Sequence, residues 1–95
     1  EAVAALSQGL GYDEERPDIH NTMGVCLFKL GRYGEAAAHF KRAVALNPSS
    51  AIDYANLALN QEQLGEFEEA RTNYETALAL DDSIAFAREH LATLS

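Results

Sequence analysis

Apolar side chains recur along the chain at spacings of three and four, which places them on one face of an α-helix. A first run begins at Pro17, a residue suited to the first turn of a helix. It ends before Gly31, which readily adopts the left-handed conformation of a helix end. The pattern therefore predicts a helix from Pro17 to Gly31, with apolar positions Ile19, Met23, Val25, Cys26, Leu27, Phe28 and Leu30.

Further helices follow from similar signals. After a turn at Arg32-Tyr33, residues 35–46 are rich in alanine and stop at Asn47-Pro48, where proline cannot continue a helix. Ser50, followed three positions later by Asp53, resembles a capping box and predicts a helix that ends at Gly65. Residues 68–80 repeat the alanine-rich pattern, and Asp82 or Ser83 is expected to cap a last helix carrying Ile84, Phe86, Ala87 and Leu91. With a half-helix near residues 1–10, six helices are predicted.

The chain also repeats itself at an offset of 34 residues. Leu30-Gly31 aligns with Leu64-Gly65, and Phe40 aligns with Tyr74. Such a period is typical of helical repeat proteins. We expect one domain over residues 1–95, with whole repeats at 17–50 and 51–84, the second helix of a truncated repeat at 1–16 and a terminal helix at 85–95.

The breadth of the apolar faces favours an open stack of helical hairpins. Residues 25–28 are four consecutive apolar residues, so at roughly 100° per residue they point to all sides of their helix. Small residues at matched places allow helix axes to approach closely, as stacked hairpins require. They are Gly24, Ala58 and Ala92, then Ala36 and Ala70, then Ala43 and Ala77.

These residues carry a resemblance to the tetratricopeptide repeat, a helix-turn-helix unit of 34 residues with characteristic small, aromatic and proline positions. His20, Gln61 and Asp82 depart from that pattern. The resemblance implies an all-α superhelix of αα-hairpins, a solenoid, which we expect to belong to a longer protein. The first repeat matches with Met23, Gly24, Gly31, Tyr33, Ala36, Phe40, Ala43 and Pro48, and the second with Tyr54, Leu57, Ala58, Gly65, Phe67, Ala70, Tyr74 and Ala77.

The resemblance further implies a concave groove, lined by the first helix of each repeat, that holds a segment of another protein. Apolar residues and amides on that face suit a peptide with apolar anchors. Two alternatives stay open, because Val25 and Phe28 can instead pack on the preceding unit and Asn56 can brace its helix. The predicted groove residues are Asn21, Val25, Phe28, Lys29, Ile52, Asn56, Leu59, Gln63, Phe86 and His90.

Chaperone-binding members of this family clamp a terminal carboxylate with Lys, Asn, Asn, Lys and Arg. Among the matching residues of this chain, Asn56 alone fits that set, so the resemblance disfavours a ligand that presents a C-terminal carboxylate. The matching residues are Asn21, Val25, Asn56, Phe86 and His90.

Charge narrows the choice of partner. The chain has 7 Lys and Arg against 15 Asp and Glu, a net charge of −8, which repels phosphate backbones and anionic lipids. Residues 17–50 hold four basic and two acidic groups, whereas residues 51–84 hold eight acidic groups and one basic group. This imbalance either steers a basic partner or reflects solvated helix faces.

A single cysteine and no apolar run of roughly 18 residues indicate a soluble protein, with the cytoplasm as its expected location.

The sequence gives little support for catalysis. The three histidines are far apart, no His-x-x-x-His or Cys-x-x-Cys spacing occurs, and the glycines form no phosphate-binding loop. Cys26 is expected to be an inert small hydrophobe at a packing surface. We therefore expect no enzyme activity, cofactor or metal.

Two functions of different class remain. The first is a protein-interaction module that binds a peptide or helical segment of a partner in its groove. The second is a structural scaffold segment that assembles end to end through apolar surfaces at Val3, Leu6 and Leu10 on one side and Ile84, Leu91 and Leu94 on the other.

Overall fold

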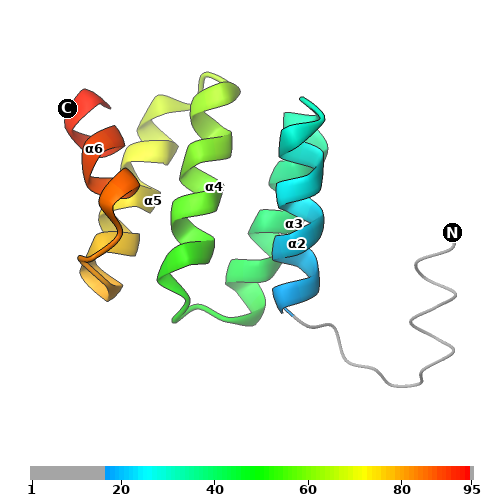
Figure 1. Cartoon of the computed structure of the whole chain (residues 1–95), viewed down its shortest axis with the longest axis horizontal. Helices are drawn as coiled ribbons and strands as arrows, with labels where there is room; N and C mark the ends of the chain where they lie inside the picture. The colour runs from blue at the N-terminus through cyan, green and yellow to red at the C-terminus, as the bar shows by residue number, and fades with distance from the viewer. Residues whose placement is uncertain (1–16, 95) are drawn as a thin grey trace, which may run out of the picture.

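The computed structural model describes residues 17–94, and within that range it contains five helices and no strand (Figure 1). The half-helix expected near residues 1–10, with Val3, Leu6 and Leu10, lies outside the described residues. The helices are α2 (Pro17–Lys29), α3 (Tyr33–Leu46), α4 (Ala51–Gln63), α5 (Phe67–Leu80) and α6 (Ala85–Leu94).

Gly31 and Gly65 end the first helix of each hairpin, as predicted. Their φ angles are 79° and 80°, in the left-handed region that favours glycine. Around Gly31, the Arg32 N–H donates to the Leu27 carbonyl at 2.9 Å and the Gly31 N–H to the Phe28 carbonyl at 3.0 Å. The equivalent bonds recur around Gly65. Both turns are Schellman motifs, which satisfy carbonyl groups that would otherwise lack partners at the helix end.

Three local expectations about helix starts were wrong. Ser50 is the N-cap of α4, but its side chain makes no capping hydrogen bond. The second helices begin at Tyr33 and Phe67, earlier than predicted, because the turn after each glycine needs few residues. Before α6, the Asp81 carboxylate accepts bonds from the Ser83 N–H at 3.0 Å and the Ser83 hydroxyl at 2.6 Å. The turn before α6 is therefore organised by Asp81, and not by a cap from Asp82 or Ser83.

The helices stack in sequence order. α2 packs on α3 and α4 packs on α5, while α3 joins the two hairpins by packing on α4, and α6 packs on α5. The first helices α2, α4 and α6 follow one another across Figure 1, with α3 and α5 between them in the stacking order. The architecture is an all-α solenoid of αα-hairpins.

The core consists mainly of alanine. Two large side chains, Phe40 and Tyr74, are fully buried among small ones and occupy matched places in the two hairpins. Gly24 is buried against the Phe40 ring, so closely that an added Cβ would lie 2.6 Å from Phe40 Cε1. Close helix approach through small residues is therefore confirmed for most of the predicted positions, which are Gly24, Ala36, Ala43, Ala58, Ala70 and Ala77.

The two ends of the stack differ from expectation. Ala92 is exposed. Its counterpart Ala58 on α4 is covered by α5, but no described helix covers the equivalent side of α6. Ile84, Leu91 and Leu94 are partly buried against the core cluster around Tyr74, so the predicted apolar end surface on α6 is largely turned inward.

Cys26 is exposed rather than packed. At the matching place in α4, Asn60 is fully buried, and its Nδ2 donates to the Tyr33 carbonyl at 2.9 Å.

Candidate functional site

Residues of α2, α3 and α4 enclose a mostly apolar pocket of about 230 Å³, which we call the anchor pocket. Five of its six lining residues are among the predicted groove residues. The sixth, Phe40, was predicted only as a matching aromatic position of the repeat and not as a groove residue. The anchor pocket is lined by Val25, Phe28, Lys29, Phe40, Asn56 and Leu59.

Helical spacing explains why these side chains meet. Val25 and Phe28 are three residues apart on α2, and Asn56 and Leu59 are three apart on α4, so each pair lies on one helical face. The two helices contact each other directly, which brings the faces together. Ile52 and Gln63 share the α4 pattern, but they are exposed and do not line the pocket.

Of the two alternatives that the sequence left open, bracing by Asn56 is present, whereas packing of Val25 and Phe28 on the preceding unit involves residues outside the described range. Val25 and Phe28 are half-buried against the cluster of Ala36, Phe40 and Leu57, and they also line the pocket. Asn56 Nδ2 donates a hydrogen bond to Asn21 Oδ1 at 2.9 Å. This bond braces α4 against α2 while leaving the other side of the Asn56 side chain at the pocket wall.

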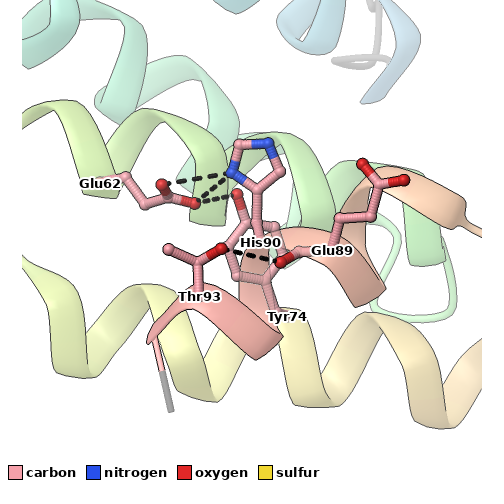
Figure 2. Close-up of polar contacts among 5 residues, drawn as sticks. All are labelled: Glu62, Tyr74, Glu89, His90 and Thr93. Atoms are coloured by element: carbon pink, nitrogen blue, oxygen red, sulfur yellow. Dashed lines mark hydrogen bonds and ion pairs between the residues drawn. The ribbon is translucent and has the colours of Figure 1, made fainter.

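The remaining predicted residues, Phe86 and His90, lie on α6. His90 forms a polar cluster with Glu62 of α4 and Tyr74 of α5 (Figure 2). His90 Nδ1 lies 2.9 Å from Glu62 Oε2, and the Tyr74 hydroxyl donates to the same carboxylate. The rings of Phe86 and His90 meet edge to face at 6.1 Å between centroids. We call the group of Glu62, Tyr74 and His90 the α6 cluster.

The α6 cluster changes the chemistry of Tyr74. Burial of the phenol raises its pKa well above its ordinary value, and the hydrogen bond to Glu62 and the charge of that carboxylate raise it further. Tyr74 thus remains a hydrogen-bond donor across a wide pH range. Sequence reasoning aligned Tyr74 with Phe40 and missed its bond to Glu62, since the hydroxyl has no counterpart on Phe40 in the first hairpin.

Several acidic side chains are exposed on the second hairpin and do not line the anchor pocket. Glu66, Glu68 and Glu69 are exposed at the start of α5, where Glu68 and Glu69 border a shallow hollow. Lys29 is the basic residue at the pocket itself. The charge imbalance of the sequence therefore appears as a basic group on α2 facing a more acidic second hairpin.

The histidines and carboxylates of the described residues form pairs and not a metal site. Within residues 17–94, no three His, Cys, Asp or Glu side chains come together in a way that could hold a metal ion. His20 and His39 do pair, with their Nδ1 atoms 3.2 Å apart between α2 and α3. A hydrogen bond of that kind joins the two helices of the first hairpin.

Known proteins identify the architecture. The sequence model of the tetratricopeptide repeat matches residues 15–83. The chain belongs to the tetratricopeptide-repeat family. No curated protein matches the sequence of the chain significantly. In the part of the chain that is described, no helix is long and apolar enough to cross a membrane.

Solved tetratricopeptide-repeat structures are similar to the chain over most of its length. The first tetratricopeptide-repeat domain of Spaghetti (RPAP3), bound to the HSP90 peptide SRMEEVD, is 26% identical with a TM-score of 0.83, covering 98% of this chain and 74% of that one. The second such domain, bound to the same peptide, is 26% identical with a TM-score of 0.72, and the match covers 84% of this chain and 81% of that one. The first domain of human RPAP3, solved by NMR, is 26% identical with a TM-score of 0.83, and the match covers 98% of this chain and 73% of that one.

Proposed function

We propose that this tetratricopeptide-repeat module binds a segment of a partner protein across α2, α4 and α6, with an apolar side chain of that segment in the anchor pocket. The observation that carries the proposal is the pocket itself, where apolar side chains of three helices surround a space that a leucine or methionine side chain fits. Asn56 and Lys29 supply polar groups at its wall. The module acts by binding and not by catalysis.

The similar structures support a peptide as the ligand. Two domains of Spaghetti (RPAP3) are bound to SRMEEVD, a peptide with apolar methionine and valine residues. The partner of this chain is expected to share the apolar anchors but to be basic rather than acidic. That expectation rests on the net charge of −8 and on Phe86 and His90, which stand where clamp-type relatives carry basic residues.

The repeat boundaries and the location are also proposals. We place whole repeats at 17–50 and 51–84, supported by the two hairpins α2–α3 and α4–α5, with α6 as the first helix of a further unit. We place the module in the cytoplasm, where the exposed thiol of Cys26 would remain reduced.

The anchor pocket can be tested with a labelled peptide, SRMKKVD, in which lysines replace the two glutamates of SRMEEVD. Phe28→Ala and Leu59→Ala are each expected to weaken binding about tenfold, because each removes apolar contact at the centre of the site. Leu80→Ala is the matched control, since Leu80 is an exposed leucine on α5 outside the pocket. Fluorescence anisotropy measures binding, and circular dichroism checks that helix content is unchanged. Unaltered affinity in both pocket variants would contradict the proposal.

Self-association remains a second candidate because Ile19 on α2 and Leu30 in the turn after α2 are 51% and 69% exposed. The apolar surface at the C-terminal end of the stack is smaller, since Leu91 and Leu94 of α6 pack toward the core. Light scattering over a range of concentrations tests this candidate, and a molecular mass that stays monomeric throughout would eliminate it.

A further inference from the structure

The α6 cluster fixes the proton positions of His90. A carboxylate oxygen can only accept hydrogen bonds, so the ring nitrogen that faces Glu62 Oε2 at 2.9 Å must donate. His90 therefore carries its proton on Nδ1, and in the neutral imidazole the lone pair lies on Nε2. Figure 2 shows this second nitrogen on the side of the ring away from Glu62. The His90 side chain is 38% exposed, so a ligand can reach it.

Glu62, the partner of this histidine, lies about one helical turn beyond the anchor pocket on α4. Glu62 follows Leu59 by three residues on α4, about 4.5 Å along the helix axis. An extended peptide advances about 3.3 Å per residue, so a side chain one or two residues from the anchor reaches the α6 cluster. One bound segment can thus occupy both places.

The electrostatic surroundings favour a positive ligand group. Glu62 carries its charge on α4 with its side chain 17% exposed, and exposed Glu89 directly precedes His90 on α6. The basic residue of this turn, Arg88, donates from Nη1 to the Asp82 carbonyl at 3.1 Å, on the side of the α5–α6 connection. Tyr74 contributes a neutral hydroxyl from α5 that is already bonded to Glu62.

We propose that Glu62 and His90 form a cation-accepting subsite, which binds the ammonium or guanidinium group of a lysine or arginine next to the apolar anchor. His90 Nε2 accepts a hydrogen bond from that group, and the Glu62 charge attracts it. Glu62 and Tyr74 act as positioning residues for the imidazole. The subsite rests on the proposed function and adds to it the chemistry of the residue that flanks the anchor.

The test compares SRMKKVD with SRMEEVD, both with the same termini. We expect the wild-type chain to bind SRMKKVD about twofold to fivefold more tightly, the scale of one partly exposed ion pair. Glu62→Gln keeps the shape of the side chain and is expected to remove most of that preference. Glu69→Gln makes the same change of charge on an exposed residue outside the subsite and is expected to keep it. His90→Gln is a second subsite variant in case Glu62→Gln lowers stability.

Nitrogen NMR of the histidine ring provides a readout that a purely structural role would not change. The Nε2 signal of His90 is expected to shift on addition of SRMKKVD and to stay in place with SRMEEVD. Equal or weaker binding of SRMKKVD, or a preference that Glu62→Gln and His90→Gln leave intact, would overturn the subsite while pocket-dependent binding still supported the module. Failure of both peptides to bind at millimolar concentration would instead count against the proposed function.

Discussion

Gly24 shows how one atom can decide the packing of a hairpin. Its α-carbon lies so close to the Phe40 ring that an added Cβ would be 2.6 Å from Cε1, closer than carbon atoms approach without repulsion. Gly34, by contrast, has nothing within 4 Å of the same added atom. Both residues lie in helices and have no positive φ.

The pair makes a matched prediction. Gly24→Ala is expected to lower the free energy of unfolding by roughly 1 kcal/mol, since overpacking outweighs the gain in helix propensity. Gly34→Ala is expected to raise it by about 0.5 to 1 kcal/mol. Urea denaturation followed by circular dichroism measures both, and a stabilised Gly24→Ala variant would show that Phe40 moves aside freely.

Tyr74 gives the chain a specific response to alkaline pH. Because its pKa is raised above the ordinary value of 10.0, the folded chain keeps the phenol proton where the unfolded chain releases it. Stability from this group is complete below pH 10 and is expected to fall as the pH rises beyond it. Tyr74→Phe lacks the titrating hydroxyl, so urea denaturation at increasing pH should show a smaller decline than in the wild type. Parallel declines would assign the effect to other groups.

Among the elements, the first helix of each hairpin ends in the same way, and the cost of altering that end can be isolated. Gly65 has a φ of 80° and open space around its α-carbon, so a methyl group meets no neighbour and disturbs only the backbone. Gly65→Ala is expected to cost about 1 kcal/mol of stability, measured by urea denaturation. Gly31→Ala serves as the internal repeat of the experiment, and a large difference between the two would mean that a tertiary contact is involved.

Sequence reasoning succeeds where the signal lies within one helix. Repeated Leu-Gly pairs predict where α2 and α4 end. Spacings of three and four place Val25 with Phe28, and Asn56 with Leu59, on one helical face, and the family resemblance indicates that this face lines the groove. It does less well where partners belong to different helices. The bond between Asn56 and Asn21 joins residues 35 apart, and that between His90 and Glu62 joins residues 28 apart. Such pairs depend on how helices sit against one another, which a periodicity does not encode.

For the whole molecule, the uneven charge predicts how binding responds to salt. Residues 51–84 hold eight acidic groups and one basic group, and the basic residues gather in residues 17–50. Attraction between a basic peptide and the second hairpin is screened by ions over about 10 Å. Stopped-flow measurement is expected to show association of SRMKKVD slowing as salt rises, and association of SRMEEVD unchanged or faster. The same slope for both peptides would argue that steering plays no part.

The alanine core has a consequence for how such a module can diversify. Among the described residues, most of the buried hydrophobic positions are alanine, with Phe40 and Tyr74 as the two large aromatic fillers. Leu59 and Lys29 line the anchor pocket but belong to neither buried cluster, unlike Val25 and Phe28. They can therefore be exchanged for others while the scaffold keeps its shape, so that new ligand preferences are reachable through single substitutions without refolding the chain around them.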